Sequence, residues 1–299
     1  MTESKLKVRL LAAISIGVIF AAGVLGFFYW RSRMQPDNNN QGLVVDTKPS
    51  LTVPVSESDV KRAIEVRVHD QPTEIRLGEV FRFGEVRDSD IAPLQDAVKL
   101  TKLELKNGNI TSEALKYLSH LHLQALDISR TKVDDLSALS KMRSLKNLTA
   151  EHIRSNDADL EALTGLSLEY LDLLGTRVQN LHALKQMQSL KEIIVSNTPL
   201  DSEGMRIISQ LKNLKRVSLI RTKIKEQDLQ YLVDLPNLQF VYLDQCPNLS
   251  KAAVKQFTKQ LPGDCNVEFE GPSVFDPCEV FKAPVTKQLS KKAKGPRPN

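Results

Sequence analysis

Histidine and cysteine are the residue types in this sequence that most often serve as catalytic groups or metal ligands. The chain contains His69, His120, His122, His152 and His182, together with Cys246, Cys265 and Cys278. No histidine has a metal-ligand spacing such as H-E-x-x-H, and there is no G-x-S-x-G, P-loop or dinucleotide-binding motif. The sequence therefore predicts no enzyme activity, no bound metal and no cofactor.

The three cysteines divide into one predicted core residue and one candidate pair. Cys246 occupies the small-residue position of the repeat described below, which predicts a buried free thiol. Cys265 and Cys278 lie close together near the C-terminus and would form a disulfide in an oxidising compartment. In the cytoplasm all three would remain reduced, so both alternatives stay open.

Residues 10–30 form an apolar stretch without a charge, and about 20 such residues suffice for a helix to cross a membrane. Tyr29 and Trp30 close the stretch, as expected at a lipid–water boundary. We predict a cytoplasmic stub and single-pass anchor over residues 1–34, with the span at about residues 9–30; a cleaved signal peptide is the alternative. The slight excess of basic residues before the stretch favours export of the remainder.

Basic residues are concentrated at the two ends of the chain. The formal net charge is +5, of which residues 1–34 contribute +4 and residues 282–299 contribute +6, leaving about −5 for the middle. This distribution does not favour specific nucleic-acid binding by the folded part. The basic tail, residues 282–299, is predicted to be disordered, with weak attraction to an anionic surface as the alternative. Residues 35–58, rich in Asn, Pro and Ser, are predicted to be a flexible linker.

From residue 100 onward the sequence repeats the frame L-x-x-L-x-L-x-x-(T/C)-x-(L/I/V). Its recurrences begin at Leu100, Leu123, Leu145, Leu168, Leu190, Leu214 and Leu238. The fourth and sixth positions are apolar, as in a short strand with one buried face. The ninth position is predicted to turn the chain while capping buried backbone groups. It holds Thr131, Thr176, Thr198, Thr222 and Cys246.

This frame resembles that of the leucine-rich-repeat family, over roughly residues 77–270. The mixed repeat lengths are most similar to those of bacterial members, and the short units are internalin-like. The resemblance implies an α/β solenoid with a parallel concave sheet and short helices or turns on the convex side. Because no unit can bury its own leucines, stacked neighbours must build the core.

The segments between the strands differ in their helical signal. Residues 110–121, 225–236 and 251–262 have helical spacing, with Thr111 or Ser112 as a candidate cap for the first. The two 22-residue units, at residues 131–142 and 176–187, predict tighter outer turns. Ile153 stands where Thr or Cys is expected, which predicts a local distortion in the third unit.

The repeats, assigned to residues 100–264, need covers at both ends. Residues 59–99 are predicted to be an N-terminal cap rich in strands, because residues 64–68 and 80–86 alternate in polarity. Residues 88–98 resemble the helical half of a repeat. A last strand is expected after Cys265, and residues 265–281 are predicted to cover the C-terminal edge.

The frame also predicts which side chains the concave face presents to a partner. An acidic group is expected in its N-terminal half, and large apolar residues bordered by arginines in its C-terminal half. Such apolar clusters with charged edges are typical of protein-binding surfaces. The alternative is that Phe240 and Tyr242 pack under the C-terminal cap and that the other apolar residues are scattered. The candidate partner-binding residues are Asp127, Glu151, Asp172, Tyr170, Leu174, Ile194, Arg216, Ile220, Arg221 and Tyr242.

Together these features predict a membrane-tethered recognition or scaffold module that binds a protein partner through its concave face. The protein is predicted to lie in a membrane, which it crosses once, with the repeat domain outside the cytoplasm. Two alternatives remain: a cytoplasm-facing regulator that recruits or inhibits an enzyme at the membrane, and a structural protein of the cell envelope.

Overall fold

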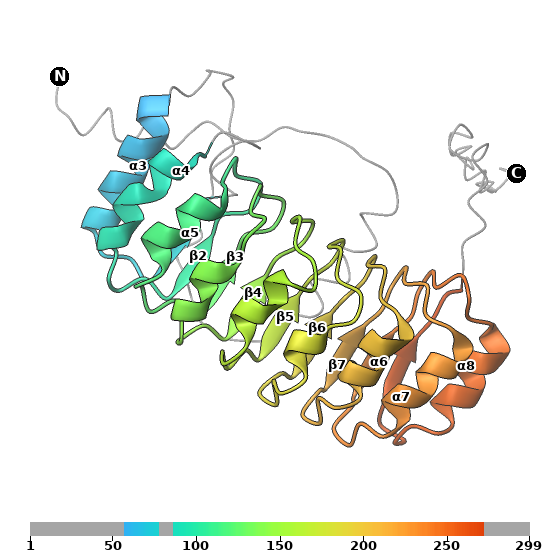
Figure 1. The fold of residues 1–299 in the computed structure, drawn as a ribbon. Coiled ribbons are helices and arrows are strands. Elements are labelled where there is room, and N and C mark those ends of the chain that lie inside the picture. Colours follow the sequence, from blue (N-terminus) through green and yellow to red (C-terminus); the bar gives the residue numbers. More distant parts are fainter. Residues whose placement is uncertain (1–56, 78–85, 272–299) are drawn as a thin grey trace, which may run out of the picture.

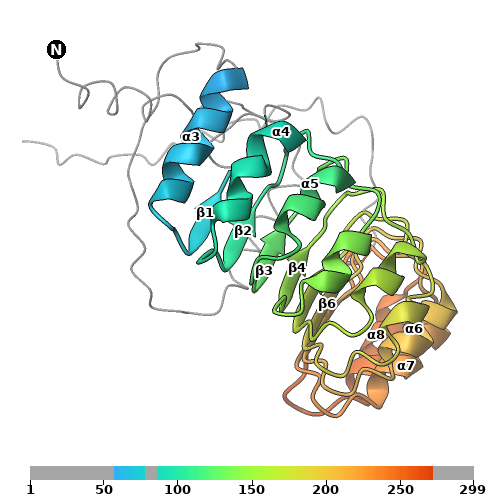
Figure 2. The same ribbon diagram turned by 60° about the vertical axis from the view of Figure 1, so that its left-hand side comes forward.

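The computed structural model describes residues 57–77 and 86–271, which coil as a solenoid from one end to the other (Figures 1 and 2). Each turn of the solenoid adds one short strand to a single sheet and one helix or turn to the opposite side. The described residues thus have the leucine-rich-repeat architecture that the frame predicts.

The sheet has nine parallel strands in sequential order. They are β1 (Glu74–Arg76), β2 (Lys102–Glu104), β3 (Ala125–Asp127), β4 (Asn147–Thr149), β5 (Tyr170–Asp172), β6 (Glu192–Ile194), β7 (Arg216–Ser218), β8 (Phe240–Tyr242) and β9 (Asn266–Glu268). Every pairing aligns equivalent positions of the frame, for example Leu171 with Ile193 and Ile193 with Val217. Side chains at one position therefore form a column along the sheet.

The convex elements follow the predicted difference between long and short units. The α-helices are α3 (Glu57–His69), α4 (Asp88–Ile91), α5 (Ser112–Leu118), α6 (Ser202–Ile208), α7 (Gln230–Val233) and α8 (Lys251–Thr258). Tighter 3-10 turns are η1 (Ala92–Asp96), η2 (Ser137–Lys141), η3 (Asp159–Leu163), η4 (His182–Leu184) and η5 (Glu226–Leu229). The two 22-residue units contain η2 and η4, so their predicted tight turns are confirmed. Thr111 caps α5 by accepting a hydrogen bond from the backbone of Glu113.

The threonines at the ninth position cap backbone carbonyls, as predicted. Thr131, Thr176, Thr198 and Thr222 each donate to the carbonyl three residues earlier, at 2.6–2.7 Å. Cys246, fully buried and free, donates its thiol to the carbonyl of Leu219 at 3.1 Å. A buried carbonyl without a partner is costly, so this column stabilises each turn out of the strand.

The position before each threonine has a left-handed backbone that the sequence analysis did not foresee. The eighth-position residues with positive φ are Asn107, Arg130, His152, Gly175, Asn197, Arg221 and Gln245. In six of these, the backbone N–H donates to the seventh-position carbonyl of the next repeat. The left-handed residue therefore extends the ladder past the strand while it turns the chain toward the convex side.

The third unit departs from its neighbours in its side chains rather than in its backbone. The distortion predicted at Ile153 is absent from the strand, because β4 keeps the common register and His152 keeps the left-handed φ of 54°. What changes is the core: Ile153 is buried at the ninth position, and Ser155 occupies a buried position that is apolar in the neighbouring units. The Ser155 hydroxyl is buried without a hydrogen-bond partner.

The N-terminal cap is helical where strands were predicted. Residues 64–68 lie within α3, which begins at Glu57, inside the segment predicted to be a linker. The buried residues Val60, Ile64 and Val68 are four apart and form one helical face, whereas Val66 is 54% exposed. The sequence pattern was ambiguous because residues four apart share a face in a helix and also in a strand. Ile64 and Val68 therefore fit both structures. Residues 80–85 of the other predicted strand lie outside the described residues.

The remaining terminal predictions fall partly within the structure. The last strand predicted after Cys265 is β9, and residues 88–96 are helical as expected. No helix within residues 57–77 and 86–271 has the length and apolarity needed to span a membrane. The predicted anchor, the basic tail and Cys278 lie outside these ranges.

Candidate functional site

The concave face presents the third, fifth and seventh positions of each repeat as neighbouring columns. Adjacent strands of a sheet lie about 4.8 Å apart, so large side chains in one column contact those of the next repeat. This contact limits exposure. Tyr170, Leu174, Arg216 and Ile220 are half-buried and Arg221 is exposed.

The prediction that all ten candidate residues are exposed is wrong for four of them. Ile194 is 3% exposed, Tyr242 5%, Glu151 4% and Asp172 1%. The frame identifies the face on which a side chain lies, but the side chains of adjacent repeats decide whether water reaches it.

The acidic residues of β3 and β5 have a structural role that their column position did not reveal. A carboxylate oxygen of Asp127 accepts a hydrogen bond from the backbone of Ser129, at 2.9 Å. Asp172 accepts in the same way from the backbone of Leu174, at 2.9 Å, and from the Tyr170 hydroxyl, at 3.2 Å. These acids therefore hold the chain at the point where it leaves the strand.

In other units, the seventh-position N–H donates to a serine hydroxyl of the preceding repeat. The hydroxyl of Ser129 accepts from the backbone of Glu151, at 3.1 Å, and that of Ser196 accepts from the backbone of Ile220, at 3.1 Å. The seventh-position N–H thus has a side-chain acceptor in four repeats. An acid at the fifth position is one solution to this requirement.

Arg216 joins three strands at the C-terminal half of the concave face. Its guanidinium donates to Glu192 on β6 at 3.2 Å and lies 5.2 Å from the ring centre of Phe240 on β8. The Phe240 and Tyr242 rings are stacked, with centres 6.5 Å apart. Burial raises the pKa of Glu192 while the ion pair with Arg216 opposes that rise. The cation is thereby fixed between a carboxylate and an aromatic ring.

Two members of this group, Glu192 and Phe240, were not among the predicted site residues. A signal existed in the sequence, because residues 192, 216 and 240 are successive members of the third column. An acid, a base and an aromatic ring at adjacent positions of one column are necessarily neighbours across three strands.

The apolar part of the face lies at the seventh position beside this group. Leu174 and Ile220 are half-buried, with Ser196 between them in the column. The repeats that have serine at this position show that a large apolar side chain is not needed for the fold. Leu174 and Ile220 therefore present apolar surface that the solenoid does not require.

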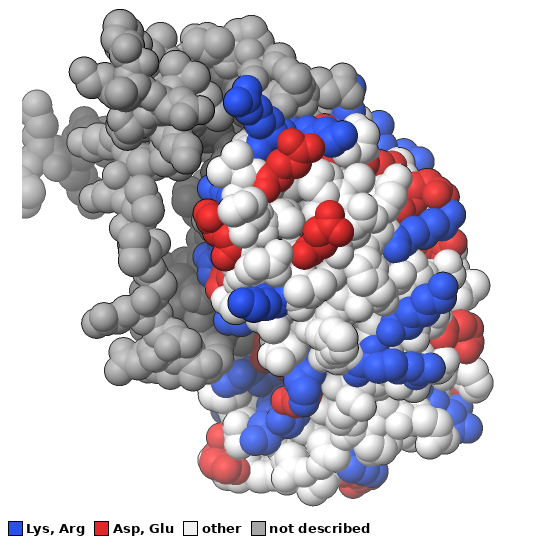
Figure 3. All heavy atoms as spheres, turned by 90° about the vertical axis from the view of Figure 1, so that its left-hand side faces the viewer, with Lys and Arg blue, Asp and Glu red and all other residues white. Residues whose placement is uncertain are grey.

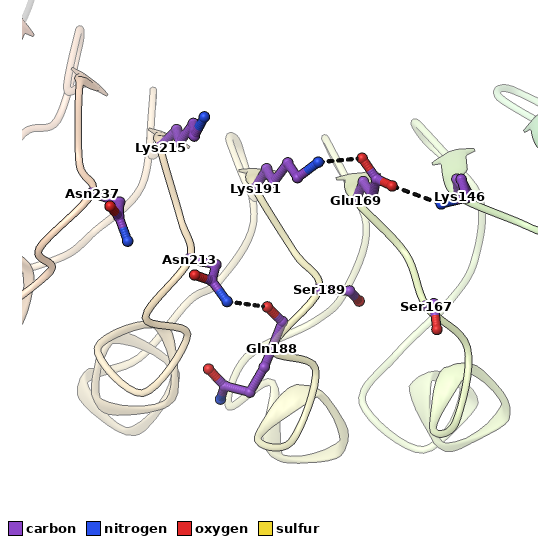
Figure 4. Close-up of a pocket in the computed structure, with 9 residues that line it drawn as sticks. All are labelled: Lys146, Ser167, Glu169, Gln188, Ser189, Lys191, Asn213, Lys215 and Asn237. Atoms are coloured by element: carbon purple, nitrogen blue, oxygen red, sulfur yellow. Dashed lines mark hydrogen bonds and ion pairs between the residues drawn. The ribbon is translucent and has the colours of Figure 1, made fainter.

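At the edge where the chain enters the strands, charged side chains neutralise one another. Glu169 is bonded to Lys146 at 2.8 Å and to Lys191 at 2.6 Å (Figure 4). These hydrogen bonds lower the pKa of Glu169 to about 2. Nearby, the Asn213 amide donates to the carbonyl of Gln188 at 2.7 Å. Most polar groups in this hollow of about 330 Å³ are therefore engaged within the protein.

Charged side chains of both signs are interspersed over the N-terminal end of the molecule (Figure 3). No group of three or more His, Cys, Asp or Glu within residues 57–77 and 86–271 is arranged to hold a metal ion. Cys265 is half-buried at the C-terminal edge.

Comparison with solved structures supports the fold and goes no further. The chain is similar to internalin C2 of Listeria monocytogenes, with 22% identity, a TM-score of 0.54, and coverage of 72% of this chain and 92% of that one. An internalin InlF from the same organism is 15% identical over 60% of this chain and 70% of its own, with a TM-score of 0.35. Models of known protein families give no match, and neither do curated proteins.

Proposed function

We propose that this protein binds a protein partner through the C-terminal half of its concave face. The observation that carries the proposal is the apolar pair Leu174 and Ile220, half-buried at a position where the fold accepts serine. On the same face, at the third position, Arg216 lies between Glu192 and Phe240. Apolar surface bordered by an ordered arginine is typical of binding hot spots, which favour preorganised anchors.

Site-specific photocrosslinking in cells tests this proposal. A photoreactive residue replaces Ile220 in one variant and Tyr117, which is 38% exposed on the convex helix α5, in a control. The proposal predicts a discrete crosslinked protein from position 220 alone. Equal crosslinking from both positions, or none from position 220, would contradict it.

We further propose that residues 1–34 tether this module to a membrane and that the repeats face away from the cytoplasm. The support is the uncharged apolar stretch at residues 10–30 and the basic residues before it. Fractionation of cells that express the full chain or residues 35–299 tests the tether, which predicts that only the full chain sediments with membranes.

Protease treatment of intact spheroplasts tests the side of the membrane. Cleavage of the repeats without lysis is expected. Protection until lysis would instead favour a regulator that faces the cytoplasm. In the exported arrangement, Cys265 and Cys278 are proposed to form a disulfide, which a mass shift after alkylation with and without reductant would reveal.

A further inference from the structure

A basic cleft lies at the opposite edge of the sheet, where the first three repeats turn from strand toward the convex side. Its volume is about 490 Å³, within the range of small-ligand sites. It is lined by Gly108, Asn109, Arg130, Thr131, Lys132, His152 and Arg154. The residues come from the eighth to tenth positions of successive repeats, so the parallel sheet brings them to one edge.

Among the described residues, no acid lines this cleft. None of the seven lining residues is an acid, and Arg130, Lys132 and Arg154 form no ion pair or side-chain hydrogen bond with the described chain. The hollow at the other edge differs, because Glu169 there neutralises Lys146 and Lys191. Like charges that line one hollow repel one another, and a bound anion relieves that repulsion.

The backbone conformation at Arg130 and His152 is a second observation about the cleft. Both have a left-handed φ, of 56° and 54°. This conformation costs energy for arginine, whereas histidine adopts it more readily. The repeats on either side satisfy the same requirement with Asn107, Gly175 and Asn197, which adopt this conformation more readily. Arg221 and Gln245 are also left-handed, but their side chains are hydrogen-bonded to each other. The left-handed backbone thus gives no reason for arginine at position 130.

Neutral donors are also available beside the cations. The His152 ring lies against Gly175, where no side chain intervenes. Burial, reinforced by the charge of Arg130 and opposed by that of Glu151, lowers the pKa of His152. This favours the neutral ring, which offers one N–H. The Asn109 side-chain amide has no hydrogen-bond partner in the described chain, whereas the Thr131 hydroxyl already donates to Ile128.

We propose that this cleft binds a phosphomonoester group. A phosphomonoester carries nearly two negative charges at pH 7 and three acceptor oxygens, which suits three cations better than a singly charged carboxylate does. The two guanidinium groups supply the paired donors that phosphate oxygens accept in bidentate geometry. The cleft adjoins the proposed protein-binding face, since the His152 N–H donates to the carbonyl of Leu174. The cations of the cleft are not among the residues that carry the proposed function, so either assignment stands without the other.

The test uses full-length protein labelled at histidine, with the His152 ring resonance followed by NMR. Glycerol 3-phosphate is the free probe and vesicles that contain phosphatidic acid are the membrane-borne probe; acetate at equal ionic strength controls for salt. Arg130→Asn and Arg154→Gln remove the proposed ligands. Arg221→Asn, at the same left-handed position four repeats away from Arg130, is the matched control.

Saturable binding of either phosphomonoester with a shift of the His152 resonance is expected, and the responding probe identifies the source of the group. Arg130→Asn should weaken binding about tenfold or more, as expected for one charged hydrogen-bonding group. It should not lower the midpoint of thermal unfolding, since asparagine favours the left-handed backbone. Arg221→Asn should bind as the natural chain does. The proposal is overturned if neither probe binds, if acetate acts equally, or if the two asparagine variants lose affinity to the same extent.

Discussion

The two halves of the concave face use equivalent positions of the repeat for different purposes. Over β3–β5, the acids Asp127 and Asp172 accept hydrogen bonds from their own turns. Over β6–β8, Ser196 serves one of those turns, while Arg216 is fixed between Glu192 and Phe240. Acidic residues at one repeat position are therefore weak evidence for a binding site, because the backbone N–H groups of the turns can require them as acceptors.

Removal of an acid from the N-terminal half is expected to have the largest effect on folding. Asp172→Ala leaves the partly buried backbone N–H of Leu174 without this acceptor and should lower the free energy of unfolding by about 1–3 kcal/mol. Asp172→Asn keeps an oxygen acceptor and should lose less. Urea denaturation measures both. Equal stability of the alanine variant and the natural chain would contradict this structural role of Asp172.

The core beneath the N-terminal half offers a gain in stability. Ser155 carries a buried hydroxyl without a partner, where the neighbouring repeats have Val133 and Val178. Ser155→Val should raise the free energy of unfolding by about 1 kcal/mol, because the unsatisfied group is removed. The same denaturation experiment checks this value. A loss of stability would mean that Ile153 already fills the available space.

In the C-terminal half, the effect of Arg216→Ala should depend on pH. Loss of the arginine leaves the partly buried carboxylate of Glu192 without its ion-pair partner. This should destabilise the protein by about 1 kcal/mol at pH 7. Burial holds the pKa of Glu192 above its ordinary value, so the charged carboxylate costs stability and protonation relieves that cost. The difference from the natural chain should therefore shrink as pH falls toward the ordinary glutamate range. A difference that grows on acidification would contradict this assignment.

The smallest expected effect concerns Glu169 at the edge of the sheet. Its pKa is lowered to about 2, so its ion pairs contribute fully above the ordinary pKa and are lost as pH falls toward 2. Solvent screening limits this contribution to less than about 1 kcal/mol, since the side chain is 33% exposed. Glu169→Gln should flatten the acid limb of the stability curve, as measured by thermal unfolding across pH. An unchanged acid limb would show that the pairs contribute nothing.

The sequence predicts the solenoid well because leucine spacing directly sets strand register. It also predicts the capping threonines and the tight turns of the short units. It does not predict helix α3, because Ile64 and Val68 are four residues apart and fit both the helical spacing and the alternation of a strand. The burial of Ile194 and the hydrogen bonds of Asp172 could not be predicted from the sequence either. Both depend on contacts with other turns or repeats, and the repeat position of a residue does not specify these contacts.

The central claim is that Leu174 and Ile220 form a partner-binding surface that the fold does not need. The most direct test measures the affinity of the crosslinked partner for Leu174→Ser/Ile220→Ser. The control is Val66→Ser/Val98→Ser, which removes two apolar side chains that are 54% and 65% exposed elsewhere. We predict at least about a tenfold loss of affinity for the first variant, as for loss of hot-spot residues, and none for the control. Unchanged affinity of a folded Leu174→Ser/Ile220→Ser protein would contradict the claim.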